Sequence, residues 1–158
     1  MNKIKKIVIG IGIGIGFLTI MMTEGSYIAH MPHENSLICK GTAGCFSGQI
    51  TQVIDGDTVV VNDVHVRFAL ASAPELSEKG GTEAKEYVES LCPVGSRALV
   101  DEDDGQTGGT YGRTVADVYC NDKLVNSALL EKGLGIIDKN FCGISEFSHD
   151  DWAKRYGC

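Results

Sequence analysis

Residues 53–75, VIDGDTVVVNDVHVRFALASAPE, consist of short apolar runs separated by turns. The runs 58–62 and 64–71 are rich in valine and flank Asn62-Asp63, a pair typical of tight turns. This pattern predicts two neighbouring antiparallel strands. The same stretch carries charged side chains that are candidates for a functional site: Asp55, Asp57, Arg67 and Glu75.

Periodicity along the rest of the chain extends this pattern to a complete domain. Strands are predicted at 48–55, 58–62, 64–71, 96–103 and 113–120. Helices are predicted at 82–92, 124–133 and 145–157, with Thr82 and Ser148 as N-caps of the first and the last. Five strands with helices inserted after the third and the fifth indicate a mainly β domain with helices (α+β). A five-stranded OB-fold barrel is the commonest such solution, and we assign it to residues 46–158.

An apolar leader precedes this domain. Three lysines, at positions 3, 5 and 6, come before 17 uncharged residues, 7–23. A basic start followed by a short apolar run is typical of a signal peptide or an N-terminal membrane anchor. We therefore expect a leader at 1–29 and a linker at 30–45. The protein is then expected to be extracellular, or tethered through residues 7–23 at the outer face of the cell membrane.

Six cysteines all follow the leader, and an even number in an exported domain points to disulfides. Six cysteines allow 15 pairings, which spacing alone does not distinguish. Joining element ends that are neighbours in an OB-type barrel would pair Cys92 with Cys120 and Cys142 with Cys158. Cys39 would then pair with Cys45. A zinc site is not expected, because the chain has no C-x-x-C motif.

The charge of the chain limits how it can bind nucleic acid. The formal net charge is −7; removing residues 1–29 takes away three lysines and one glutamate, which leaves −9. A surface of this sign argues against a broad basic platform for nucleic acid. A polyanion would have to be held locally, by a few arginines or by a bound cation.

Several short motifs follow one another in a family-specific order. They are D-G-D-T at 55–58, an arginine at position 67, A-P-E at 73–75, Y-G-R at 111–113 and L-V-N at 124–126. In this order and spacing the chain resembles the staphylococcal nuclease (thermonuclease) family over about residues 47–141. The resemblance implies an OB barrel that hydrolyses phosphodiester bonds of DNA or RNA as an endonuclease, with Ca²⁺ or another divalent cation as cofactor.

The resemblance also implies roles for individual residues. Arg67 and Arg113 match the two arginines that bind the phosphate, and Glu75 matches the glutamate proposed to activate the attacking water. Two guanidinium groups suit the oxygens of a phosphodiester, because each can donate two parallel hydrogen bonds. A tyrosine that stacks on the nucleotide in the best-known member is Lys139 here, although Tyr111 remains.

The implied metal site is altered in this chain. Asp57 matches the metal-binding aspartate of D-G-D-T, with Asp55 nearby, and Ala73 matches a position that contributes its backbone carbonyl. Ser72 stands where the family has an aspartate that also binds the metal. Because the affinity of a calcium site depends on the charge of its ligands, this serine predicts weaker Ca²⁺ binding.

Two functions remain open on the sequence. The first is a nuclease that acts on DNA or RNA without a protein partner, as a monomer. The second is an OB-fold nucleic-acid-binding module that has kept the scaffold and lost efficient catalysis. The acidic run at 101–104 is either a solvated loop or an auxiliary cation site.

Overall fold

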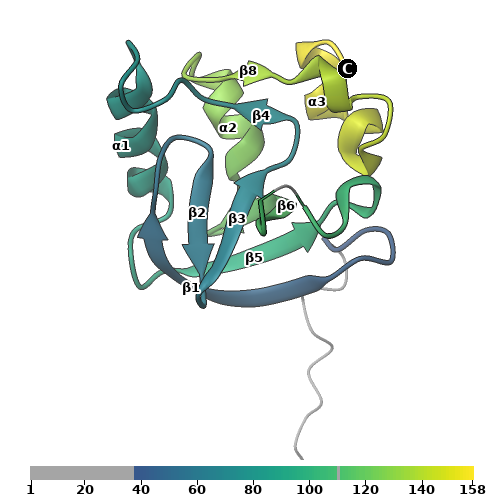
Figure 1. Ribbon diagram of the computed structural model, residues 1–158, viewed down its shortest axis with the longest axis horizontal. Coiled ribbons are helices and arrows are strands. Elements are labelled where there is room, and N and C mark those ends of the chain that lie inside the picture. The colour runs from purple at the N-terminus through teal and green to yellow at the C-terminus, as the bar shows by residue number, and fades with distance from the viewer. Residues whose placement is uncertain (1–37, 110) are drawn as a thin grey trace, which may run out of the picture. The chain divides into compact units, whose positions relative to one another are not determined.

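The computed structural model describes residues 38–109 and 111–158, and its centre is a closed five-stranded barrel (Figure 1). The barrel strands are β1 (Cys45–Val53), β2 (Thr58–Val61), β3 (Val64–Phe68), β5 (Arg97–Glu102) and β6 (Thr114–Cys120). They pair antiparallel in the order β3-β2-β1-β5-β6, and a parallel pairing of β3 with β6 closes the barrel. This is the predicted five-stranded OB-type architecture.

Three helices and three very short strands complete the domain. The helices are α1 (Gly81–Leu91), α2 (Val125–Glu131) and α3 (Asp151–Tyr156). Figure 1 shows them next to one another along one end of the barrel, and α2 contacts both of the other helices. The short strands are β4 (Ala71–Ser72), β7 (Lys123–Leu124) and β8 (Ile136–Ile137); β4 and β8 pair antiparallel outside the barrel.

Asn126 links α2 by hydrogen bonds to the region where β3 and β6 pair and close the barrel. Its side chain is fully buried, and its amide donates to the carbonyls of Ala69 and Ala116, each at 3.0 Å. Its side-chain oxygen accepts from the Val118 N–H at 3.0 Å. An apolar residue here would leave these buried backbone groups unpaired, which costs about 1–3 kcal/mol for each group. The asparagine of the L-V-N motif is therefore a structural residue.

The predicted N-cap of the first helix is wrong. Helix α1 starts one residue earlier than Thr82, after Gly80, which has a left-handed φ of 94° and makes no side-chain cap. At Gly81 the backbone passes so close to the Glu75 carbonyl that an added Cβ would lie 2.0 Å from its oxygen. The helix start is thus set by a close backbone approach that only glycine allows.

The last predicted helix, 145–157, is two elements. A 3₁₀ helix, η4 (Glu146–His149), is capped by the Ser145 hydroxyl, which accepts from the Phe147 N–H. Helix α3 then begins after Asp150, so the predicted cap Ser148 lies inside η4 and is buried. Both serines fit the same cap pattern in the sequence, and the burial of the Phe147 ring is what distinguishes them.

The linker predicted at 30–45 differs from the structure in its last part, which is attached to the domain. Cys45 already belongs to β1, and residues 40–44 make hydrogen bonds to β5 and to the residues directly after it. Residues 30–37 and the predicted leader lie outside the described residues. Among the helices at 38–109 and 111–158, none is long and apolar enough to cross a membrane.

All six cysteines are in disulfides, and the three pairs are the expected ones. They are Cys39–Cys45, Cys92–Cys120 and Cys142–Cys158, with Cα–Cα distances of 6.0, 5.5 and 5.3 Å. Each distance lies in the ordinary disulfide range. The second pair is buried and joins the end of α1 to the end of β6.

Candidate functional site

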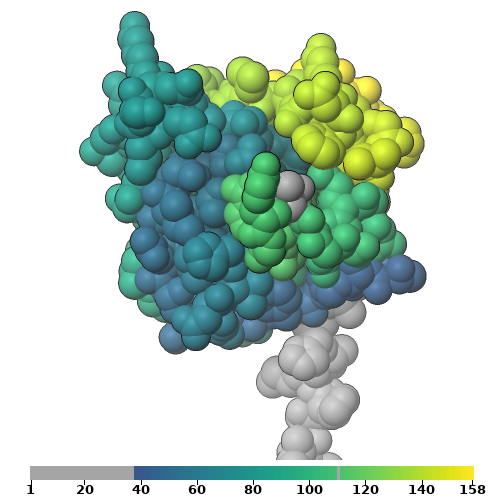
Figure 2. Space-filling model, viewed as in Figure 1, coloured from purple at the N-terminus to yellow at the C-terminus, as the bar shows by residue number. Residues whose placement is uncertain are grey.

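The three predicted catalytic residues line one pocket. Arg67 comes from β3, Glu75 from the loop after β4, and Arg113 from the residue before β6. The pocket has a volume of about 320 Å³. Figure 2 shows the loop between β5 and β6 (green) standing out from the face in view, next to part of the C-terminal segment (yellow-green).

Strand alternation explains the position of Arg67. Its neighbours Val66 and Phe68 are buried in the barrel, so Arg67 lies on the opposite face with 27% of its side chain exposed. Directly after β3, Leu70 is buried with a left-handed φ of 58°, an unfavourable conformation for leucine. This residue redirects the chain from β3 into β4, so that Ser72 comes within reach of Arg67.

Asp57 does not line the pocket itself; it is buried next to Arg67, which does, and is surrounded by hydrogen-bond donors. Its Oδ1 accepts from Arg67 Nη1 at 2.5 Å and from the Thr58 hydroxyl at 3.1 Å. Its Oδ2 accepts from the Ala73 N–H at 2.8 Å. Burial raises the pKa of the Asp57 carboxyl, while the Ala73 N–H and the Arg67 guanidinium oppose that rise. The carboxylate is therefore already engaged by three donors from the protein itself.

Ser72 makes a second hydrogen bond to the guanidinium group of Arg67. Its hydroxyl oxygen accepts from Arg67 Nη2 at 3.1 Å, so each terminal nitrogen of the guanidinium has one protein partner. The serine thus takes the place of a family metal ligand and binds the arginine instead. Asp55 is also engaged, because its Oδ1 accepts from the Asp57 N–H at 3.0 Å within the D-G-D turn.

This donor set does not fit a calcium cage. Calcium takes about six to eight oxygen ligands, often from several carboxylates. Within the described residues, no group of three His, Cys, Asp or Glu donor atoms gathers at this pocket. A smaller, hydrated cation such as Mg²⁺ is commonly held by one or two carboxylates together with substrate phosphates, and Asp57 fits that arrangement.

A fourth ionisable residue lines the pocket, Asp138, which was not among the predicted site residues. Its N–H donates to the Leu70 carbonyl at 2.8 Å, and its Oδ1 accepts from the backbone N–H of Asn140 at 3.2 Å. The formal charges of the pocket side chains therefore cancel, with two arginines against Glu75 and Asp138. The family motifs did not point to this residue; its one signal is the D-x-N spacing of a capped turn.

Tyr111, the remaining candidate for stacking, is 92% exposed. Its ring centroid lies 5.9 Å from the guanidinium carbon of Arg113, within the range of a cation–π contact. An aromatic ring so open to solvent, and next to a pocket arginine, is available to stack on a base.

The acidic run at 101–104 does not line the pocket and is not a solvated loop. Asp103 is fully buried and accepts from the N–H groups of Gly105 and Glu146. Asp104 accepts from the N–H groups of Thr42 and Ala43. These carboxylates hold the start and the end of the domain against the region after β5.

Comparison with known proteins agrees with the fold. The family model for staphylococcal nuclease homologues matches residues 65–151, which include all three predicted catalytic residues. An uncharacterized protein of Bacillus anthracis is 32% identical over 124 residues, covering 72% of this chain and 57% of that protein. An uncharacterized 38.1 kDa protein of Capnoides sempervirens is 33% identical over 82 residues, covering 51% of this chain and 22% of that protein. The chain thus spans little more than half of the first relative and less of the second. Because the family match covers more than half of its length, the chain belongs to the staphylococcal nuclease homologue family.

Proposed function

We propose that the protein is a nuclease that hydrolyses phosphodiester bonds of DNA or RNA with the help of a divalent cation. The observation that carries this proposal is the pocket in which Arg67, Glu75 and Arg113 come together from three separate parts of the chain. A binding module would need the arginines but would have no use for a carboxylate beside them. Membership of the family supports the same activity.

The arginines would hold the phosphodiester and stabilise its charge in the transition state. Attack by water increases the negative charge on the non-bridging phosphate oxygens, and fixed positive groups stabilise that increase. A guanidinium carries five N–H donors. Arg67 uses one from each terminal nitrogen to reach Asp57 and Ser72, so further donors remain for the substrate.

Glu75 would take the proton from the attacking water. Its side chain is exposed at the pocket, where water can reach it. Its backbone is fixed on both sides, because its carbonyl accepts from the Glu78 N–H at 2.8 Å and its N–H donates to Glu78 Oε2 at 3.0 Å. A base held in this way can act on a water molecule positioned next to the bound phosphate.

Asp57 would hold the divalent cation, with the Ala73 carbonyl as the second ligand that the family resemblance implies. When bound, the cation would offset the charge of the phosphate. Asp57 would have to share its oxygens between the cation and Arg67. We therefore propose that the cation binds weakly to the free protein and more tightly together with substrate.

We also propose that the protein is exported, free or tethered by its leader. The three disulfides support an oxidising compartment, because such bonds are rare where glutathione and thioredoxin keep thiols reduced.

A cleavage assay tests the proposed activity. The full chain is incubated with labelled single- and double-stranded DNA and RNA in Ca²⁺, Mg²⁺, Mn²⁺ or EDTA. We expect cleavage with divalent cations, at least as fast in Mg²⁺ or Mn²⁺ as in Ca²⁺, and none in EDTA. Cleavage that persists in EDTA would contradict the metal requirement.

The second candidate function is nucleic-acid binding without catalysis. The observation that favours it is the Asp57–Arg67 ion pair, supported by Ser72, which satisfies the charges of the site internally. The same assay separates the two functions. Oligonucleotide binding without cleavage under every metal condition would establish the binding module and reject the nuclease.

Replacing Ser72 by aspartate should tighten calcium binding. The change restores a second carboxylate next to Asp57, and the affinity of a calcium site rises with the charge of its ligands. We expect the Kd for Ca²⁺ to fall about tenfold or more, which corresponds to about 1.4 kcal/mol. Isothermal titration of the free protein measures it.

The matched control is Ser72→Asn, which has the shape of aspartate without its charge. It should leave the Kd for Ca²⁺ close to that of the wild type. If Ser72→Asp binds calcium no better than Ser72→Asn, then the cation is held elsewhere and Asp57 is not its ligand.

A further inference from the structure

Residues 39–44 form a small loop that is bound to carboxylates from β5 and from the residue two positions after it. The Lys40 N–H donates to Asp101 Oδ2 at 2.9 Å, and the Thr42 N–H donates to both oxygens of Asp104 at 2.9 Å. The Ala43 N–H also donates to Asp104, at 2.6 Å. All of these contacts join backbone N–H groups to carboxylate oxygens, and none involves the sulfur atoms of the disulfide that joins the two ends of the loop, Cys39 and Cys45.

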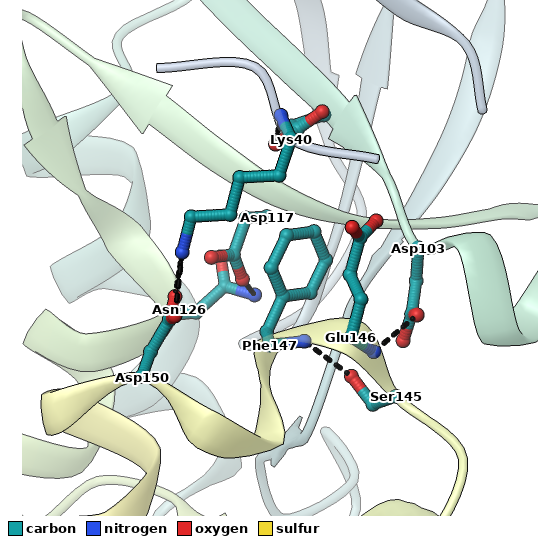
Figure 3. Close-up of polar contacts among 9 residues, drawn as sticks. Lys40, Asp103, Asp117, Asn126, Ser145, Glu146, Phe147 and Asp150 are labelled. Atoms are coloured by element: carbon teal, nitrogen blue, oxygen red, sulfur yellow. Dashed lines mark hydrogen bonds and ion pairs between the residues drawn. The ribbon is translucent and has the colours of Figure 1, made fainter. Parts of the chain in front are cut away.

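The side chain of Lys40 anchors the loop a second time. Figure 3 shows it extending past Phe147 to Asp150, with which it forms an ion pair. The Lys40 ammonium lies 5.9 Å from the centroid of the Phe147 ring, and that ring is buried. The loop is thus fixed to both the barrel and the C-terminal helices.

This arrangement places three residues of metal-binding types together. One donor atom each from Cys39, Cys45 and Asp101 lie within 4.8 Å of one another. Asp101 is only 1% exposed, and while its Oδ2 accepts from Lys40, its Oδ1 has no hydrogen-bond partner. A buried, unpaired carboxylate oxygen is costly, and a bound cation would satisfy it.

We propose that Cys39, Cys45 and Asp101 form a zinc site that exists only when the Cys39–Cys45 disulfide is reduced. Disulfide sulfur is a poor ligand, whereas two thiolates and one carboxylate are typical ligands of Zn²⁺. Water would occupy the fourth tetrahedral position. The sequence gives no zinc motif here, because the third ligand comes from β5, far from both cysteines along the chain.

Forming this zinc site requires reduction of the Cys39–Cys45 disulfide by a reductant of the dithiol class. One of its thiolates attacks a cysteine sulfur, and its second thiol resolves the mixed disulfide. Two electrons pass to the protein, the dithiol becomes a disulfide, and Cys39 and Cys45 become thiols. Each thiol then loses its proton as it binds Zn²⁺. Because backbone hydrogen bonds to Asp101 and Asp104 hold the loop, we expect the thiols to stay beside Asp101 after the S–S bond is broken.

Cobalt binding tests the proposal without any measurement of nuclease activity. The full chain is reduced with dithiothreitol, freed of it by anaerobic gel filtration, and titrated with Co²⁺. Free thiols at positions 39 and 45 are verified by mass spectrometry after alkylation. We expect one Co²⁺ per chain, with a thiolate-to-cobalt charge-transfer band that Zn²⁺ removes by displacement. The oxidised protein should show no such band.

Three variants make the result specific to this site. The double substitution Cys39→Ser with Cys45→Ser should abolish the band, and Asp101→Asn should weaken Co²⁺ binding at least tenfold. The matched control, Cys142→Ser with Cys158→Ser, removes another half-buried pair and should leave the band unchanged. The proposal is overturned by a reduced wild type without the band, by a band that survives the first double substitution, or by unchanged affinity in Asp101→Asn.

Discussion

Replacing Glu75 by glutamine is expected to lower turnover by about 10²-fold or more, the scale of a lost general base. Glutamine keeps the shape of the side chain and its place at the rim of the pocket, but its amide cannot take a proton from water. Because Arg67 and Arg113 remain, oligonucleotide binding should change little. The loss should therefore appear in kcat and not in KM, measured on a labelled oligonucleotide.

The matched control is Glu86→Gln, which removes a carboxylate from the exposed face of α1 and away from the pocket. It tests whether one fewer negative charge on this acidic protein changes cleavage by itself. If Glu75→Gln and Glu86→Gln both cleave as fast as the wild type, then Glu75 is not the base and Asp138 becomes the next carboxylate to examine.

Strand alternation in the sequence was enough to predict the barrel. Val59, Val61, Val66 and Phe68 are all buried, while Arg67 lies on the other face. A strand with one buried face has a fixed register, because a slip of one residue would exchange its two faces. The clustering of the catalytic residues was implied by the family resemblance, and the register agrees with it for the two arginines, since Arg67 pairs with Val115, two residues after Arg113, where β3 meets β6.

Features that depend on backbone approach or on distant partners were not predictable. In the sequence alone, Thr82 has the features of a helix N-cap. The actual start of α1 is set by the close contact between Gly81 and the Glu75 carbonyl, which the sequence does not reveal. The pocket position of Asp138 depends on the pairing of β8 with the two-residue strand β4. Such short strands have too few residues to show a period in the sequence.

The acidic run 101–104 also depends on distant partners, and the structure rejects one of its two interpretations, the solvated loop, because Asp101 and Asp103 are buried. Its first residue, Asp101, lies directly opposite Asp117 in the pairing of β5 with β6, and both carboxyl groups are buried. Facing like charges destabilise a sheet. Asp117 Oδ1 accepts from the Asn126 amide at 2.9 Å, while its Oδ2 has no partner. Figure 3 shows Asp117 with Asn126 beneath the extended side chain of Lys40.

These buried acids couple folding to proton binding. Burial raises the pKa of Asp117 well above its ordinary value, and the charges of Asp150, Asp101 and Asp103 raise it further, while Lys40 lowers it. Burial also raises the pKa of Asp101 to about 6, although the Lys40 N–H opposes that rise. Both groups therefore bind protons more tightly in the folded protein than in the unfolded chain.

The sign of the resulting pH dependence follows from linkage. A raised folded-state pKa contributes stability that is fully present below the unfolded pKa and is lost as the pH rises through the folded value. For Asp101 the loss falls between about pH 4 and pH 6. For Asp117 it continues to higher pH. The wild type should accordingly be less stable at pH 8 than at pH 5 in urea denaturation.

Asp117→Asn should remove most of this dependence and stabilise the protein. An amide needs no proton to be neutral, and it can still accept the hydrogen bond from Asn126. The stability advantage over the wild type should grow by about 1.4 kcal/mol per pH unit, as long as the pH lies between the unfolded and folded pKa values of Asp117. Urea titrations at pH 5, 6, 7 and 8 measure this slope.

Asp63→Asn, in the exposed turn between β2 and β3, controls for the loss of one negative charge. A constant stability difference across these pH values, or a variant less stable than the wild type at pH 8, would show that Asp117 is charged in the folded protein. The facing carboxylates would then have to be stabilised by Lys40 and by a bound cation, and not by a proton.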